Sequence, residues 1–261
     1  VFRKLPDVVK LIIKQFSKPQ KVSVVLVKDY YSNHEDRPEQ LLKSKRYHSF
    51  AVEPEMILQM RPKWKNFDDY TASMSKKYRN RARTVMMKSA ELVERDLDAK
   101  QLAKLIDKLY PLYLNLHVKA RFRLAALTPR YFVEMKEQFP ESFIVKTYSL
   151  NGEIVGFRSF FLNENQLDAH FIGVNYELNR EINLYQRILY DFVSDAIHAG
   201  SSELLLGRTA AEIKSTIGAI PHDLTCYIRH RNSLSNQIIR PFIDYLKPSD
   251  WTPRSPFRLG E

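Results

Sequence analysis

The chain is short of the residues on which several common kinds of protein depend. It has one cysteine, Cys226, in 261 residues, so it forms no internal disulfide and no cysteine-based zinc site. A chain without disulfides suits a reducing compartment, and we therefore expect a cytoplasmic protein. Its seven glycines fall well below the usual content of about 7%, which counts against the glycine-rich phosphate loops of nucleotide-binding enzymes.

Long apolar segments and several catalytic motifs are missing as well. Charged residues interrupt the apolar runs long before they reach the roughly twenty residues that a membrane-spanning helix needs. The seven histidines are scattered, with no pair at ligand spacing, so we expect no metal site. The sequence contains no GxSxG, Walker or GxGxxG motif, which counts against the hydrolase and nucleotide-binding classes that these motifs mark.

What the chain does have is positive charge and apolar residues. The net charge is +11, and hydrophobic residues make up 44% of the chain, enough for the core of one large domain or two small ones. The charge is unevenly spread, because residues 1–75 contribute +5, residues 76–136 contribute +9 and residues 137–261 contribute −3. Most of the positive charge therefore lies in the middle of the chain.

The densest basic stretch begins at residue 76. Apolar residues recur there at spacings of three and four, which predicts an amphipathic helix over residues 76–95, capped by Asn66, Ser73 or Ser75. Its basic face is either a solvated surface or a binding surface for a polyanion such as RNA, a nucleotide pyrophosphate or an anionic lipid headgroup. The apolar stripe is Met74, Tyr78, Ala82, Val85 and Met86, and the basic residues are Lys76, Lys77, Arg79, Arg81, Arg83 and Lys88.

After residue 142 the hydrophobic period changes from near 3.6 to 2, which marks a change from helices to strands. Asn151-Gly152 accepts the positive φ angles of a type I′ turn, so the strands on either side of it are expected to form a hairpin. The predicted antiparallel meander has strands at 143–150, 153–162 and 166–174.

Helices and strands alternate on both sides of the meander, which predicts an α+β (α/β layered) fold with a mixed sheet flanked by helices. The first 60 residues repeat the closing order of elements, and we interpret them as the closing part of a preceding related half. Residues 61–261 then form the main domain, with a helical region at 66–138 and a sheet region at 143–246. We expect helices at 7–16, 37–46, 102–116 (kinked or divided at Pro111), 129–138, 184–199, 210–217 and 233–246, and further strands at 22–29, 48–60, 203–206 and 224–231.

Residues 207–219 are the first candidate site. They leave a predicted buried strand and enter a short helix, a position where side chains and backbone N–H groups converge on one edge of a sheet. Arg208 and Thr209 lie at the turn and Lys214 lies within the helix, which favours a binding site. In the alternative interpretation, Arg208 pairs with Glu212 and Lys214 is solvated.

The third meander strand and the helix after it hold further candidates. Strand alternation places Asp168 and His170 on one polar face, opposite Phe171. His170 is of the right type for a general base, or else is a hydrogen-bonded structural histidine. Tyr185 and Arg187 begin the next helix, where the helix dipole favours an anionic group, although Tyr185 equally suits the core.

Three passages carry a resemblance to a known fold: KYRNRAR at 77–83, FIGVNY at 171–176 and GRTAAEIKSTIGA at 207–219. With the order of elements, they resemble the GNAT-type acyl-CoA N-acyltransferase fold over residues 61–258, and most closely its FemAB-like branch, which includes the Fem peptidyltransferases of peptidoglycan synthesis. The resemblance implies that Lys214 steadies negative charge on the attacked carbonyl. In the enzymatic hypothesis that we draw from these residues, Arg208, Thr209 and Ser215 bind substrate, and His170 or Asp168 handles the proton.

The chain departs from the GNAT pattern in one place. GNAT acetyltransferases hold the coenzyme A pyrophosphate on a glycine-rich turn after the meander, whereas residues 176–183 read YELNREIN, with no glycine. Fem-type enzymes also lack that turn and take an aminoacyl group from tRNA. The resemblance therefore favours aminoacyl-tRNA over acyl-CoA as the donor.

The leading hypothesis is an N-acyltransferase that moves an acyl or aminoacyl group onto an amine whose identity the sequence leaves open. In the alternative, the chain is a non-catalytic GNAT-fold module that binds RNA or another polyanion through the helix at 76–95. A third hypothesis is peripheral binding to anionic lipid headgroups through the same helix.

Overall fold

The computed structural model describes residues 11–12, 14–15, 22–32, 38–118, 126–239, 241, 243 and 250–258. The chain divides into two compact units. The first consists of Val1–Glu55 and Pro221–Trp251, and the second of Met56–Ile220 and Thr252–Glu261. The predicted first domain ended at residue 60 and did not include the later segment, and its interpretation as half of a related pair stays a prediction.

The first unit is built around three strands in the order β1-β8-β2. β1 pairs antiparallel with β8. Leu42, Tyr47 and Tyr227 form one buried cluster, and Cys226 lies in a second with Phe50. The elements are β1 (Val24–Tyr31), α2 (Glu39–Ser44), the first part of β2 (His48–Gln59), most of β8 (Ile220–His230) and α10 (Ser233–Gln237). The predicted helices at 7–16 and 233–246 lie partly outside the described residues.

The second unit holds the end of β2 and the rest of the sheet, in the order β2-β7-β6-β5-β4-β3. Strands β3 to β6 pair antiparallel, β6 and β7 run parallel, and β7 pairs antiparallel with β2, so the sheet is mixed as predicted. The elements are α3 (Phe67–Ala72), α4 (Lys76–Lys88), β3 (Val93–Asp96), α5 (Ala99–His117), α6 (Pro129–Gln138), β4 (Phe143–Leu150), β5 (Glu153–Asn163), β6 (Gln166–Val174), α7 (Tyr176–Ile182), α8 (Leu184–His198), β7 (Glu203–Leu205) and α9 (Ala211–Ser215).

Local sequence accounts for several of these boundaries. Asn151 and Gly152 have φ angles of 52° and 84°, the positive values that the β4–β5 hairpin requires. Asp98 and Gln101 form a capping box at the start of α5, which satisfies two free backbone N–H groups. Pro111 lies inside α5, which is not divided there. The elements α3, β3 and α7 were not predicted, and the predicted helix over residues 76–95 is too long, because α4 ends at Lys88 and residues 93–96 pair with β4 as the strand β3.

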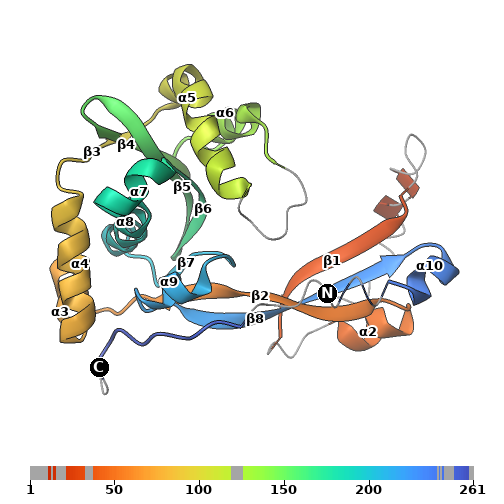
Figure 1. Ribbon diagram of the computed structural model, residues 1–261. Helices are drawn as coiled ribbons and strands as arrows, with labels where there is room; N and C mark the ends of the chain where they lie inside the picture. Colours follow the sequence, from red (N-terminus) through yellow and green to blue (C-terminus); the bar gives the residue numbers. More distant parts are fainter. Residues whose placement is uncertain are drawn as a thin grey trace. The chain divides into compact units, whose positions relative to one another are not determined.

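Helices cover both faces of the meander strands (Figure 1). On one face, Val145 and Phe157 pack with residues of α5 and α6 in a buried apolar cluster. On the other, Phe160 packs its ring against Phe192 of α8. Each face is buried because apolar residues alternate along the strands and a helix covers each set.

The parallel pair β6–β7 determines where the chain leaves the sheet. The paired residues are Gln166–Asp168 of β6 and Glu203–Leu205 of β7, after which β6 continues to Val174 while β7 ends. The chain then turns through Gly207, with φ at 70°, and Ala210, with φ at 57°, into α9. This turn brings α9 to the side of the unit where α4 lies.

Candidate functional site

A cavity of about 550 Å³ lies in the second unit, between α4, α9 and the C-terminal segment at 252–258. It joins two of the passages that carried the resemblance, 77–83 and 207–219, which are far apart in the sequence. Its lining residues are Lys77, Tyr78 and Arg81 of α4, Ala210, Glu212, Ile213 and Thr216 at α9, and Arg254.

Helix α4 presents its basic residues to the cavity because its apolar stripe is buried. Tyr78, Ala82 and Val85 are the buried residues of this helix. Lys77 and Arg81, one position before Tyr78 and Ala82, therefore lie on a neighbouring face one helical turn apart. Ser75 is the N-cap position but makes no side-chain capping bond, and Asn66 caps α3 instead.

The remaining basic residues of α4 do not line the cavity. Lys76, Arg83 and Lys88 are exposed to solvent. Arg79 is half-buried and donates a hydrogen bond to the carbonyl oxygen of Ala72. The six predicted polyanion-binding residues are thus divided between the cavity and the outer surface of the helix.

Lys214 stabilises the turn from which α9 begins. Its Nζ donates to the carbonyl oxygens of Leu206 at 2.6 Å and Gly207 at 3.3 Å, and the residue is only 5% exposed. The ammonium group therefore lies at the end of β7, and Lys214 is absent from the cavity lining. Its role in stabilising a reaction intermediate stays a prediction.

The other predicted residues of this segment lie around the same turn. Arg208 is half-buried and Thr209 is exposed, and neither lines the cavity. The buried hydroxyl of Ser215 donates to the carbonyl oxygen of Glu212 at 2.7 Å. The carboxylate of Glu212, which the alternative interpretation paired with Arg208, forms an ion pair with Arg254.

The C-terminal segment is the part of the site that sequence reasoning missed. Arg254 donates from Nη2 to Oε1 of Glu212 at 2.5 Å. Phe257 packs against Gly218, and any side chain at that glycine would collide with the Phe257 ring. A lone arginine in the stretch Thr-Pro-Arg-Ser-Pro follows no recognisable motif, so only the path of the folded chain reveals its position.

The cavity carries an excess of positive charge. Its lining has three cations, Lys77, Arg81 and Arg254, and one carboxylate, Glu212. Within the described ranges, no carboxylate lies within ion-pair distance of Lys77 or Arg81. Gln186 of α8, with its amide oxygen turned toward Arg81, accepts a hydrogen bond from that guanidinium. A cavity with two unneutralised cations attracts an anionic ligand.

His170 lies on the sheet face covered by α5 and α6 and does not line the cavity. Its ring nitrogens are 3.0 Å from the Tyr131 hydroxyl and 3.2 Å from the Ser159 hydroxyl. Burial lowers the pKa of His170 to about 4, because a charged imidazolium is unfavourable away from water. The imidazole is therefore neutral at pH 7, and its proposed part in proton transfer stays a prediction.

The predicted alternation along β6 holds as far as His170, which shares a face with Asp168 and contacts Phe161, and it is wrong at Phe171. Ser159 pairs with Phe171 and Phe160 pairs with Ala169, so His170 is the extra residue of a bulge. The bulge brings Phe171 to the same face as His170, with the two ring centroids 4.3 Å apart. Asp168, half-buried on β6, pairs with Phe161 before the bulge and likewise does not line the cavity.

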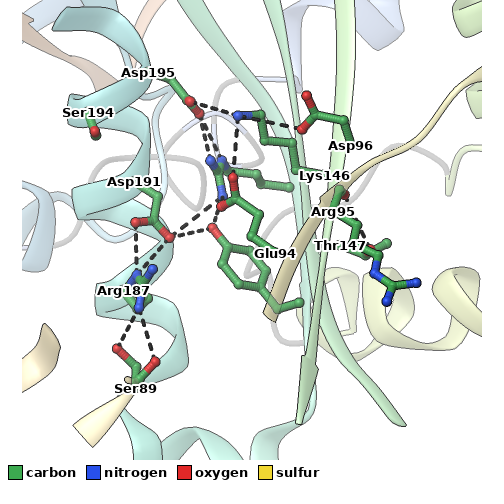
Figure 2. Close-up of polar contacts among 12 residues, drawn as sticks. Ser89, Glu94, Arg95, Asp96, Lys146, Thr147, Arg187, Asp191, Ser194 and Asp195 are labelled. Carbon is green, nitrogen blue, oxygen red and sulfur yellow. Dashed lines mark hydrogen bonds and ion pairs between the residues drawn. The ribbon is translucent and has the colours of Figure 1, made fainter. Parts of the chain in front are cut away.

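Arg187 connects α8 to the end of α4 (Figure 2). Its Nε donates to Asp191 at 2.8 Å and its Nη1 donates to the carbonyl oxygen of Ser89 at 3.0 Å. Tyr185 is half-buried, and burial raises the pKa of its hydroxyl well above the ordinary value. Neither residue lines the cavity, so substrate binding by Tyr185 and Arg187 stays a prediction.

Arg187 belongs to a larger set of ion pairs between α8 and the sheet, which we call the Arg158 network (Figure 2). Arg158 of β5 is 1% exposed and donates to Asp195 at 2.7 Å and to Glu94 of β3 at 2.5 Å. Lys146 of β4 lies 3.0 Å from Asp195. The network consists of Glu94, Asp96, Lys146, Tyr148, Arg158, Arg187, Asp191 and Asp195.

No metal site or membrane-spanning helix is found in the part of the chain that the structure describes. No group of three or more His, Cys, Asp or Glu side chains among those residues is arranged to hold an ion. None of the described helices combines the length and apolar character needed to cross a bilayer.

Comparison with solved structures identifies the fold. FemX is similar with a TM-score of 0.59 and 10% identity, over 91% of this chain and 79% of that one. A C-terminal domain (DUF2156) assigned to a lysylphosphatidylglycerol synthetase of Agrobacterium fabrum is similar with a TM-score of 0.57 and 12% identity, over 90% of this chain and 76% of that one. A GCN5-related N-acetyltransferase of Kribbella flavida is similar with a TM-score of 0.52 and 10% identity, over 89% of this chain and 77% of that one.

These similarities confirm the predicted GNAT-type fold and its likeness to the FemAB-like branch. Identities of 10 to 12% show a shared fold and not a shared activity. No protein-family profile matches the sequence. No curated protein matches it either.

Proposed function

We propose that the protein is an N-acyltransferase that transfers an acyl or aminoacyl group to an amine acceptor. The observation that carries the proposal is the cavity itself, in which the basic helix α4 meets the segment after β7. The fold is one shared with acyltransferases, and a cavity wall with two cations that no carboxylate neutralises suits a donor that carries phosphate. Aminoacyl-tRNA is such a donor and needs no glycine-rich turn.

In the proposed reaction the acceptor nitrogen attacks the carbonyl carbon of the donor. With aminoacyl-tRNA as the donor, the carbonyl oxygen gains negative charge and loses it again when the bond to the ester oxygen breaks. The proton that the nitrogen loses passes to the departing oxygen, which leaves as the free hydroxyl of the tRNA. Lys77 and Arg81 hold the phosphate of the donor and so orient its carbonyl. Glu212, the carboxylate among the lining residues of the cavity, is of the right charge to pair with an acceptor amine in its ammonium form.

The test is transfer from radiolabelled aminoacyl-tRNA or acyl-CoA to a panel of amines. Arg81→Gln, which removes a cation from the cavity wall, is expected to lower transfer at limiting donor by about tenfold, the value of one charge-assisted hydrogen bond. Arg83→Gln is the matched control, because Arg83 is an exposed arginine of the same helix outside the cavity. Equal rates for the two variants, or no transfer by the wild type to any amine, would refute the proposal.

A second function is favoured by the cations outside the cavity. Lys76, Arg83 and Lys88 are exposed on α4 and suit a non-catalytic surface for RNA or another polyanion. Binding to tRNA should then fall steeply with salt and be lost when Lys76, Arg83 and Lys88 are replaced by glutamate. Flotation with and without anionic lipid separates RNA binding from peripheral contact with a membrane.

A further inference from the structure

The backbone of the C-terminal segment is held in place at Arg254 and at the residues just after it. The backbone N–H of Arg254 donates to the Ser215 hydroxyl at 3.0 Å, and the N–H of Ser75 donates to the carbonyl oxygen of Pro256 at 2.8 Å. Phe257 pairs with Met74 as an isolated β-bridge. These contacts fix the position from which the Arg254 side chain reaches into the cavity.

The side chain of Arg254 is much less restrained than its backbone. Its ion pair with Glu212 is open to solvent, with side-chain exposures of 41% for Arg254 and 50% for Glu212. An exposed pair of this kind contributes little to stability. An incoming anion can therefore replace Glu212 at the Arg254 guanidinium at little cost.

The other two cations of the cavity have no carboxylate within ion-pair distance among the described residues. Lys77 and Arg81 line the same cavity as Arg254, and Glu212 is the carboxylate among the lining residues. The excess of two positive charges equals the charge of a dianionic phosphate group. Guanidinium groups bind phosphate oxygens through paired N–H donors, and a lysine adds a third point of contact.

We infer that Arg254 is a ligand-binding residue that exchanges Glu212 for a phosphate group held jointly with Lys77 and Arg81. The inference concerns the cavity of the proposed function and rests on that proposal for its link to acyl transfer. The exchange has a consequence for the acceptor, because it leaves the Glu212 carboxylate free to pair with an ammonium group. Phosphate binding then precedes and favours binding of the amine.

Calorimetric titration with inorganic pyrophosphate at low salt tests the exchange without any need for turnover. Arg254→Gln is expected to weaken binding by about tenfold or more, since it removes a charge-assisted pair of hydrogen bonds. Arg254→Lys keeps the charge and loses the planar fork, so its affinity for pyrophosphate should lie between those of the wild type and Arg254→Gln. Glu212→Gln should tighten binding several-fold, because the internal competitor for Arg254 is gone.

Arg130→Gln is the matched control. Arg130 is an exposed arginine paired with Glu134 four residues on, on α6 and outside the cavity, so its loss should leave pyrophosphate binding unchanged. Unchanged binding in Arg254→Gln, or weaker binding in Glu212→Gln, would overturn the inference. A merely structural role for the pair predicts that both variants weaken binding together.

Two further comparisons identify the source of the phosphate and separate this inference from the proposed function. If binding to vesicles containing phosphatidylglycerol depends on Arg254, the phosphate belongs to a lipid headgroup, and if only soluble pyrophosphate depends on it, the ligand is a soluble phosphate ester. Acyl transfer by the wild type with no effect of Arg254→Gln on pyrophosphate would remove the inference and leave the proposed function. If pyrophosphate binding depends on Arg254 but no amine is acylated, the inference holds and the proposed function is refuted.

Discussion

The second unit has two clusters of charged residues that differ in how their cations are neutralised. In the Arg158 network, Arg158 and Lys146 each lie within ion-pair distance of at least two carboxylates. In the cavity, Lys77 and Arg81 have none among the described residues. Neutralised and buried cations connect elements of the fold, whereas unneutralised cations on a cavity wall favour a ligand. The difference lies in the partners and not in the residue types.

The Arg158 network should therefore be sensitive to the loss of a single residue. Arg158→Leu removes the cation that Glu94, Asp191 and Asp195 share. These three mostly buried carboxylates then have only two cations, Lys146 and Arg187, to neutralise them. The free energy of unfolding should fall by about 3–5 kcal/mol, as measured by urea denaturation. Arg83→Leu, at an exposed position, should change it by less than about 0.5 kcal/mol. Similar losses for both would contradict the comparison.

His170 gives the next largest effect, as a dependence of stability on pH. Its pKa in the folded protein is about 4, below its ordinary value, so the unfolded chain takes up the proton first as the pH falls. Stability is therefore lost between about pH 6.5 and 4, by up to about 3 kcal/mol. His170→Gln should remove this part of the pH dependence in parallel urea titrations. An unchanged difference between pH 6.5 and 4 would show that His170 is solvated.

Replacing Lys214 should have an intermediate effect. Lys214→Met removes the Lys214 donor from the carbonyl oxygen of Leu206 and leaves that of Gly207 with the Met56 N–H alone, which should cost about 2 kcal/mol of unfolding free energy. Lys77→Met, in the cavity wall, is the control and should cost almost nothing. If Lys214→Met abolishes acyl transfer while stability is unchanged, the lysine acts on the reaction directly and not through the turn.

The parts of this fold that sequence alone predicts are those with a strong local signal. The meander follows from alternating residues and from Asn151-Gly152, and the helical spacing of apolar residues predicts α5, which Asp98 caps. The elements α3 and β3 are too short for a periodic pattern, with six and four residues. The strand β3 is held by pairing with β4 and by ion pairs such as Glu94–Arg158, which only the folded chain brings together.

The sequence predicts the individual segments of the candidate site but not that they meet at one cavity. Local pattern singled out α4 and residues 207–219, but nothing local predicts that they line one cavity with Arg254. The resemblance implied a catalytic role for Lys214, yet its ammonium group is directed to the carbonyls at the end of β7. Whether a cation faces a ligand or a backbone carbonyl depends on packing, which spacing along the chain does not reveal.

The smallest effect concerns the cavity itself. If Lys77 and Arg81 lack only an anion, bound pyrophosphate should neutralise their charge as the carboxylates of the Arg158 network neutralise Arg158 and Lys146. At a concentration ten times its dissociation constant, a ligand raises the free energy of unfolding by about 1.4 kcal/mol. The double variant Lys77→Gln with Arg81→Gln should lose this gain in urea denaturation, with an unchanged stability when no ligand is present. A double variant that is destabilised without ligand would mean that these cations already have partners, and the contrast between the two clusters would disappear.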